Sequence, residues 1–241
     1  MSKIKILSGW SNPGGSTIAF INLCNLFNEN GLDCTFYGLH DWHLGRCKSG
    51  RLQDCAVNEE EENLIFHFLK IPQRPEVSNK VILACHEKDI YPVKDVKPFW
   101  DDIVYVSESQ MDWQGVPGIV VPNVISPLHA LEKSFSVAGV IGSIDKNKNT
   151  HVSIERALTD GHSKVLLYGL VTDDAYYSEE VKKYVESGKA EIMKYEDDKQ
   201  KMYNSLSDVY HSSLSETFNF IKPECASNEN YSCSTTVYHS A

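Results

Sequence analysis

The sequence predicts an α/β protein built from two Rossmann-like domains. Short apolar runs alternate with longer amphipathic segments along the whole chain, and a glycine-rich loop separates the first apolar run from the first amphipathic one. A stretch rich in Pro, Asn and Ser near residues 122–135 divides this alternation into two series. Strands joined by helix-length segments form parallel sheets. We therefore expect domains at 1–125 and 126–241, which together enclose a ligand cleft.

The first series begins with KIKIL at 3–7, followed by a helix whose apolar residues recur at i, i+3, i+4 and i+7. Ser16 or Thr17 is its expected N-cap, and Asn30–Gly31 suits its C-terminus. The acidic run at 59–62 is expected to be a solvated turn or helix start. Further strands are predicted at 34–39, 63–69, 80–85, 102–107 and 118–124.

The second series repeats the alternation of strands and helices. Gly188 is placed to end one of its helices. Strands are predicted at 137–142, 164–169, 190–193 and 208–213, and helices at 151–161, 178–188 and 198–207. The C-terminal residues 231–241 offer one more strand.

Composition excludes several classes of protein. The 241 residues are 41% hydrophobic and 23% charged, which is typical of a globular protein. The formal net charge of −10 is shared equally, with 11 basic against 16 acidic residues in 1–125 and 12 against 17 in 126–241. Neither half has the basic field that nucleic acid or an anionic membrane requires. A bound phosphate would depend on a few local donors.

The cysteines and the N-terminus indicate a cytoplasmic protein. The chain has 7 cysteines, an odd number, with no C-x-x-C pair, which favours reduced thiols. The apolar run near the N-terminus is too short for a signal peptide or a membrane span.

Three loops carry candidate ligand-binding residues. NPGGST at 12–17 lies between a strand and a helix, where Gly14 and Gly15 let a ligand approach the backbone and the helix N-terminus favours an anion. His86 follows a strand, where an imidazole can bind a hydroxyl or move a proton. Lys148 lies in a strand-to-helix loop and can hold a phosphate. A tight turn, a polar loop residue and a solvated basic turn are the respective alternatives.

A metal site has weak support. The segment HDWHLGRC contains His40, Asp41, His43 and Cys47, but their spacing matches no standard zinc pattern. Neither G-x-G-x-x-G, nor a P-loop, nor G-x-S-x-G is found in the sequence.

The order of these motifs resembles that of the retaining glycosyltransferases of family four, which have the two-Rossmann GT-B architecture. The similarity extends from Lys3 to about Ala226. VPNVISP at 121–127 resembles the family's linker signature. NSLSDVYHSSLSETFNFIKPECAS at 204–227 resembles its most specific block, which contains two glutamates, here Glu216 and Glu224, separated by seven residues.

The resemblance implies a function and a set of site residues. The chain would move a sugar from a nucleoside-diphosphate sugar to an acceptor with retention of configuration, without metal or further cofactor. The first domain would bind the acceptor and the second the nucleotide sugar. His86 and Glu216 would lie by the transferred sugar, with Gly14 and Gly15 bordering the diphosphate or the acceptor.

The remaining roles concern the nucleotide. Lys148 would contact the diphosphate, and Glu224 would accept hydrogen bonds from the ribose hydroxyls. Tyr195 would lie in the loop that flanks the base. The backbone around Thr217, Phe218 and Asn219 would meet the sugar hydroxyls and the phosphates.

The chain departs from the family pattern in three places. Ser143 follows Gly142 where the family has an arginine, and Asn219 replaces a glycine. The sequence ends soon after Glu224, so the second domain is expected to be shortened. A catalytically impaired nucleotide-sugar-binding relative is therefore an alternative. Another Rossmann enzyme, such as an epimerase or a dinucleotide oxidoreductase, is a third hypothesis.

Overall fold

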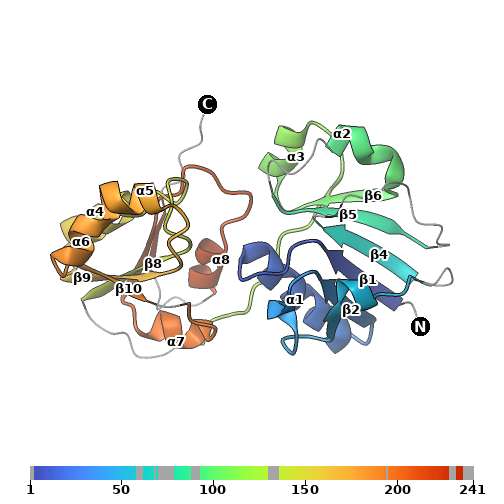
Figure 1. Cartoon of the computed structure of the whole chain (residues 1–241), viewed down its shortest axis with the longest axis horizontal. Helices are drawn as coiled ribbons and strands as arrows, with labels where there is room; N and C mark the ends of the chain where they lie inside the picture. Colours follow the sequence, from blue (N-terminus) through green and yellow to red (C-terminus); the bar gives the residue numbers. More distant parts are fainter. Residues whose placement is uncertain are drawn as a thin grey trace. The chain divides into compact units, whose positions relative to one another are not determined.

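The structure is a computed structural model. It describes residues 3–57, 62–67, 69, 79–87, 93–129, 136–193, 195–227 and 232–235. The chain divides into two compact units, Met1–Ile125 and Ser126–Ala241, coloured blue to green and yellow to red in Figure 1. Each unit is built around one sheet whose strands are all parallel. The predicted α/β class with two Rossmann-like units is therefore confirmed.

The first unit follows the strand–helix alternation that the sequence predicts. Its longer elements are a central strand, a 15-residue helix and the strands that flank them. In chain order they are β1 (Lys3–Ser8), α1 (Gly15–Glu29), β2 (Asp33–Gly38), η1 (Asp41–His43), β3 (Ser49–Arg51), η2 (Leu52–Asp54), β4 (Glu62–His67), β5 (Val81–Cys85), α2 (Val93–Val96), η3 (Lys97–Phe99), β6 (Asp102–Tyr105), α3 (Glu108–Gln114) and β7 (Ile119–Val120).

In the first unit, the order in which strands are added to the sheet changes direction at β1. Its strand order is β3-β2-β1-β4-β5-β6-β7, so the chain first builds outward to β3 and then returns to add β4 on the other side of β1. Parallel α/β sheets bind ligands at such a switch point, beyond the carboxyl ends of the strands. Here these ends are Ser8 and His67, which are direct neighbours in the β1–β4 register.

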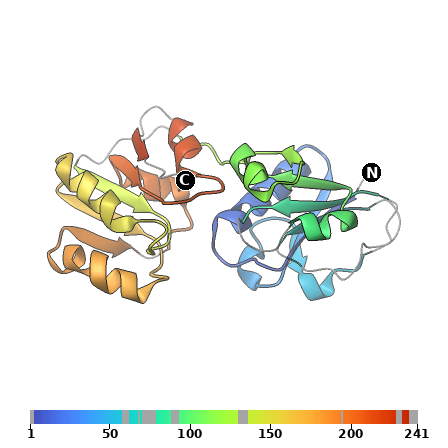
Figure 2. The same ribbon diagram turned by 90° about the horizontal axis from the view of Figure 1, so that it is seen from above.

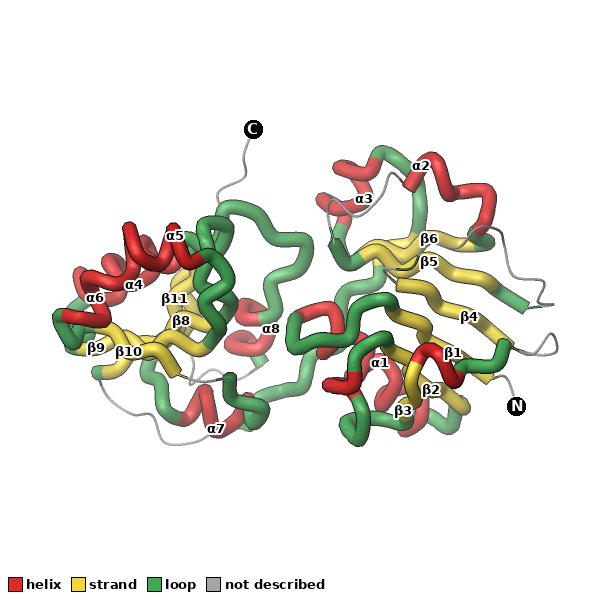
Figure 3. The backbone as a smooth tube through the Cα atoms, viewed as in Figure 1, coloured by secondary structure: helices red, strands yellow, loops and turns green. Residues whose placement is uncertain are grey.

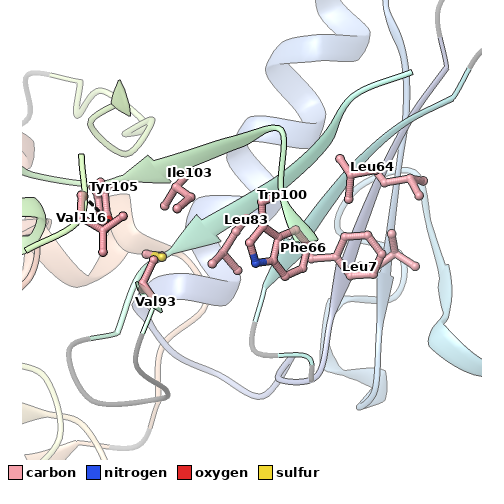
Figure 4. Close-up of a cluster of buried hydrophobic side chains, with 11 residues drawn as sticks. Leu7, Leu64, Phe66, Leu83, Val93, Trp100, Ile103, Tyr105 and Val116 are labelled. Atoms are coloured by element: carbon pink, nitrogen blue, oxygen red, sulfur yellow. Dashed lines mark hydrogen bonds between the residues drawn. The ribbon is translucent and has the colours of Figure 1, made fainter. Parts of the chain in front are cut away.

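Both faces of this sheet are covered, because alternate residues of each strand point to opposite sides. Ile6 and Phe36 pack with Phe20 of α1 on one face. Leu7 lies on the other face, in the cluster drawn in Figure 4, which is closed by Trp100 and by Tyr105, whose hydroxyl donates to Val116 O at 2.9 Å. Figures 1 and 2 show α1 on one side of the sheet and α2 and α3 on the other.

The second unit has a smaller sheet of the same kind, with strand order β10-β9-β8-β11-β12. Its switch point lies between β8 and β11. In chain order the unit contains β8 (Val137–Ile141), α4 (Thr150–Thr159), β9 (Lys164–Tyr168), α5 (Asp174–Tyr176), η4 (Tyr177–Val181), α6 (Lys182–Glu186), β10 (Ala190–Met193), α7 (Lys199–Asn204), β11 (Asp208–His211), α8 (Ile221–Ala226) and β12 (Ser232–Thr235).

Helices also cover both faces of the second sheet. Ile154 of α4 and Val181 of η4 pack on Val140 and Val165 on one side. On the other side, α7 and α8 form a cluster with Val209. Figure 3 shows these helices in red on either side of the yellow strands. Within the described residues, no helix is both long and apolar enough to cross a membrane.

Several local expectations from the sequence are corrected. The N-cap of α1 is Gly14, so Ser16 and Thr17 lie inside its first turn. Glu62 is not solvated: it begins β4, is buried, and lies 2.7 Å from the Lys5 ammonium; 59–61 lie outside the described residues. The strand predicted at 118–124 is reduced to Ile119–Val120. The helix predicted at 178–188 is a longer region made of α5, η4 and α6.

Candidate functional sites at the two switch points

Polar side chains from β1, β4 and β5 form a hydrogen-bonded chain at the switch point of the first unit. Ser8 Oγ lies 2.8 Å from His67 Nδ1, and His67 Nε2 lies 2.7 Å from Glu87 Oε2. Ser8 and His67 are buried, whereas the Glu87 side chain is 30% exposed. The parallel register creates this contact, since it sets Ser8 beside His67 at the ends of adjacent strands.

His86 lies directly behind this chain. Its ring centroid is 4.4 Å from that of Phe20 and 5.4 Å from that of His67. Burial, and next the neighbouring His67, lower the pKa of His86 to about 3, so its imidazole is neutral at physiological pH. Burial tends to raise the pKa of Glu87, but hydrogen bonding to His67 outweighs this and lowers it. A neutral imidazole beside a carboxylate can bind hydroxyl groups and does not attract a phosphate.

The glycine-rich loop lies at the same edge of the sheet. Gly14 has an extended backbone, and a side-chain carbon at this position would lie 3.9 Å from Asn12 O, which is an ordinary contact. Neither strain nor packing within the first unit therefore requires glycine there. Gly15 begins α1, and Ser16 in its first turn helps to lower the pKa of Glu87. Thr17 Oγ1 is buried without a protein partner.

The second switch point brings together a lysine, a glutamate and a histidine. Lys148 Nζ lies 2.5 Å from Glu216 Oε1, and His211 Nε2 lies 3.1 Å from the same oxygen. Lys148 comes from the loop after β8 and Glu216 from the loop after β11. The two loops are also joined through their backbones, because Leu214 N donates to Asn147 O at 2.7 Å. The predicted residues Lys148 and Glu216 thus belong to one cluster.

Glu216 is held as a carboxylate. Burial tends to raise its pKa, but the nearby His211 imidazole and the charge of Lys148 outweigh burial and lower the pKa to about 2. Lys148 has three N–H donors and is partly exposed, so it can serve a further acceptor while it holds Glu216.

The loop that carries Lys148 is organised by Asp145. The Asp145 carboxylate accepts from Ser143 Oγ at 2.5 Å, from Lys148 N at 2.8 Å and from Thr172 Oγ1 at 3.2 Å. Ser143, the residue that replaces the family's arginine, therefore binds a carboxylate within its own loop. Close packing also constrains this region, because a side-chain carbon on Gly169 would lie 1.8 Å from the carbonyl oxygen of Gly142.

Buried hydroxyl groups lie near the N-terminus of α4, a helix of 10 residues. Ser153 Oγ on α4 and Ser212 Oγ after β11 are buried and have no protein partner. Unpaired buried hydroxyls are costly and commonly mark ligand sites. Together with Lys148 and the positive end of the α4 dipole, they form a set of groups suited to an anion.

Glu224 belongs to a third cluster, in which both carboxylate oxygens have protein partners. Lys199 Nζ pairs with Oε1, and the Tyr203 hydroxyl donates to Oε2 at 2.8 Å. The side chain is only 3% exposed. α8 begins at Ile221, so Glu224 lies within this helix, directly after Pro223, which occupies the first turn, where no helical N–H is needed.

The remaining predicted contacts lie on loops of the second unit. Tyr195 follows β10 and is 39% exposed. Thr217 is half-buried, and the Phe218 ring meets that of Phe220 edge-on at 5.0 Å between centroids. Asn219 does not adopt the left-handed conformation that a glycine would favour; instead its Oδ1 accepts from Ile221 N at 3.0 Å and so starts α8.

Sequence reasoning missed Ser8, His67 and His211. Each is the last residue of its strand, at the edge where parallel sheets place functional side chains. The rule that singled out His86 would have found Ser8, which follows the predicted strand at 3–7. His67 and His211 lie inside the strands predicted at 63–69 and 208–213, so that rule could reach them only once the observed strand ends were known.

The weak metal candidate in the first unit has a structural explanation. His43 is buried, with Nδ1 2.7 Å from His40 O and Nε2 2.8 Å from Gly50 O. Asp41 pairs with Arg51. Among the described residues, no group of three or more His, Cys, Asp or Glu side chains is arranged to hold a metal ion.

Comparison with known proteins gives a fold and no sequence family. No protein-family model and no curated protein matches this chain. Among solved structures, Anabaena Alr3699/HepE in complex with UDP and glucose has a TM-score of 0.72 at 11% identity, over 98% of this chain and 81% of that one. A glycosyltransferase from Rickettsia africae gives 0.67 at 11%, over 98% and 80%. AviGT4, a glycosyltransferase of avilamycin A biosynthesis, gives 0.60 at 14%, over 87% and 70%.

The chain has the fold of these glycosyltransferases. At such low identity the likeness establishes the fold, and the chemistry has to be argued from the two clusters.

Proposed function

We propose that this protein is a glycosyltransferase that moves a sugar from a nucleoside-diphosphate sugar to an acceptor with retention of configuration. The observation that carries the proposal is the Lys148–Glu216–His211 cluster at the switch point of the second unit. There a cation, buried hydroxyls and a helix N-terminus lie beside a carboxylate that is ionised at neutral pH. This combination suits a ligand with an anionic part and a neutral, hydroxyl-rich part.

The charges assign the two parts of the donor. The diphosphate belongs near Lys148 and the start of α4, where N–H dipoles and the ammonium stabilise the charge that builds up as the diphosphate leaves. The transferred sugar belongs near Glu216, because a carboxylate accepts hydroxyl hydrogen bonds well and repels phosphate. We further propose that Tyr195 flanks the base and that the backbone at Thr217, Phe218 and Asn219 contacts the sugar and phosphates.

Two further roles complete the proposal. Glu224 accepts from the ribose through the lone pairs that Lys199 and Tyr203 leave free. His86, a neutral imidazole, faces the transferred sugar, with Gly14 and Gly15 beside it. No metal and no cofactor other than the donor is required. The reduced thiols of the described chain suit a cytoplasmic protein.

UDP is the first nucleotide to test, since HepE was solved with UDP and with UDP-glucose. Calorimetric titration with UDP, GDP and ADP should show binding by at least one of them. Lys148→Met should weaken that binding about 10- to 100-fold, the range of a charge-assisted hydrogen bond. Lys146→Met removes an exposed lysine from the same loop and should leave the affinity unchanged. Absence of binding by all three nucleotides at millimolar concentration would refute the proposal.

A second candidate is a nucleotide-sugar-binding relative without transferase activity. The contact between Ser143 and Asp145 favours this candidate. Where the resembled pattern has an arginine, this loop has Ser143 bonded to a carboxylate, and a carboxylate repels the diphosphate that the loop would hold. Turnover separates the two: binding without sugar transfer or donor hydrolysis, across several UDP-, GDP- and ADP-sugars, would support this candidate.

A further inference from the structure

The loop between β1 and α1 carries an exposed indole on a fixed backbone. Trp10 is 39% exposed, two residues beyond the end of β1. Its backbone N–H donates to Ser8 Oγ at 3.1 Å, and Ser8 Oγ in turn donates to the Trp10 carbonyl. Large aromatic side chains that stay exposed on an ordered backbone are typical of binding surfaces, since little conformational entropy is lost when they make a contact.

The loop is also tied to the loop after β2. Ser11 Oγ donates to His40 O at 2.6 Å and accepts from His40 N at 2.7 Å. The Trp10 and His40 rings meet edge-on with centroids 5.6 Å apart. Gly38 permits this approach, because a side-chain carbon there would lie 2.5 Å from Ser11 Cβ. Leu39, 55% exposed, adds apolar surface beside His40.

The buried chain described above ends on this loop. Glu87 is hydrogen-bonded to His67, and His67 is hydrogen-bonded to Ser8. Ser8 in turn is hydrogen-bonded to both the backbone N–H and the carbonyl of Trp10. Gly9 N also donates to the carbonyl oxygen of His67 at 3.0 Å. The side chains of Glu87 and His67 thereby determine, through Ser8, where the backbone places the indole.

Charge indicates which ligand this surface accepts. Among the described residues, Glu87 is hydrogen-bonded to His67 and Asp41 is paired with Arg51. A carboxylate at this edge disfavours a phosphate, and an indole face attracts the weakly positive C–H groups of a sugar ring. The surface therefore suits a neutral ring rather than the nucleotide.

We propose that Trp10, with Leu39 and His40, forms the acceptor platform of this protein for a neutral saccharide ring, and that His67 and Glu87 are positioning residues that hold Trp10 through Ser8. The assignment of this surface to the acceptor rests on the proposed glycosyltransferase function. The binding of a saccharide to Trp10 is independent of it and can be tested alone.

The test uses the full chain labelled with fluorotryptophan, in which the fluorine resonance of Trp10 is assigned by its loss in Trp10→Phe. Titration with maltose, cellobiose and lactose should shift the Trp10 resonance and leave that of Trp113 unchanged. Trp113 is a suitable control, because it is 48% exposed and lies in the last turn of α3. If none of the three sugars moves the Trp10 resonance at millimolar concentration, the platform is refuted.

Variants test the positioning role. Glu87→Gln and Ser8→Ala should both change or broaden the Trp10 resonance without moving that of Trp113. If folded Glu87→Gln leaves the Trp10 resonance unchanged, the positioning role is wrong; if it does not fold, Ser8→Ala decides. In a transfer assay, Trp10→Ala should raise the acceptor KM about tenfold and leave the donor KM unchanged, whereas Trp113→Ala should change neither.

The outcomes separate this inference from the proposed function. UDP binding with no response of Trp10 to any sugar would overturn the inference and leave the transferase intact. A Trp10 response to sugar without nucleotide binding would refute the transferase and keep the saccharide site. A rise of the donor KM in Trp10→Ala would place the donor, not the acceptor, on this loop and so overturn the assignment.

Discussion

The two switch points share a topology and differ in charge. In each unit the first strand is central: the next strand in the chain pairs with one of its edges, and a later strand pairs with the other. Polar residues lie at the carboxyl ends of the strands at this point. The first point holds Ser8, His67 and Glu87, with a neutral His86 behind them. The second holds Lys148 and Glu216 beside a helix N-terminus. Topology thus fixes where a ligand can bind, and the side chains decide that one site suits a neutral ring and the other an anion.

We expect the largest difference between the two sites in the free energy of unfolding after the carboxylate of each site is replaced by an amide. The pKa of Glu216 falls from 4.5 to about 2, which corresponds to about 3 kcal/mol of stability at pH 7. Glu216→Gln should lower the free energy of unfolding by up to that amount in urea titrations. Glu87→Gln should cost less, because Glu87 is more exposed.

The pH dependence follows from the sign of the shift. Because the folded pKa of Glu216 is depressed, its contribution is complete above about pH 4.5 and is lost as the pH falls towards 2. The difference in the free energy of unfolding between the parent protein and Glu216→Gln should therefore become smaller in acid. A Glu87→Gln variant that is destabilised as much as Glu216→Gln would contradict the contrast between the sites.

A smaller effect is expected at the Glu224 cluster, which lies outside both switch points. Tyr203→Phe removes a hydrogen bond to a buried carboxylate and should lower the free energy of unfolding by about 2 kcal/mol. Nucleotide affinity, measured by calorimetry, should change less than about twofold, because Lys199 still holds Glu224. A large affinity loss would show that Tyr203 belongs to the binding site.

His86 should respond to pH in the manner of a half-buried neutral base. Its pKa is lowered to about 3 by burial and by His67, so the unfolded chain binds a proton that the folded chain does not. Stability should fall as the pH drops from about 6.5 towards 3, by at most about 1.4 kcal/mol per pH unit. His86→Gln should flatten this part of the curve, and exposed His129→Gln serves as control. A ring resonance of His86 that titrates between pH 5 and 8 would contradict the assignment.

The smallest effect is expected for a surface ion pair away from both sites. Lys80 lies 2.6 Å from Asp102, but its side chain is 60% exposed. Lys80→Met should leave the free energy of unfolding almost unchanged in the same urea titrations, because solvent screens an exposed ion pair. This variant is a control for the others. If it were destabilised as much as Glu216→Gln, the removal of a charge by itself would explain both losses of stability.

Much of the fold could be predicted from the sequence. Strands such as Val81–Cys85 and Lys164–Tyr168 fall where apolar runs predict them, because continuous apolar runs are the mark of strands buried on both faces. The N-cap of α1 was misplaced, since several residues in that segment have suitable capping side chains or backbone. Glu62 was misjudged because its burial depends on Lys5, which is distant in the sequence.

The candidate site could be predicted only in part. Lys148 and His86 were found from their places after strands and Glu216 from the family resemblance, but their partners His211 and His67 were not found. The role of each predicted residue towards a ligand stays a prediction.

The sequence by itself determined the alternation of strands and helices, the parallel sheets that follow from it, and the loops in which Gly14, Lys148 and Glu216 lie. These are local properties of periodicity and turn chemistry. Only the tertiary structure decided which of these loops meet. Lys148 and Glu216 are 68 residues apart, and Ser8 and His67 are 59 apart. Strand order and register make them neighbours, and neither is encoded in the spacing of residues along the chain.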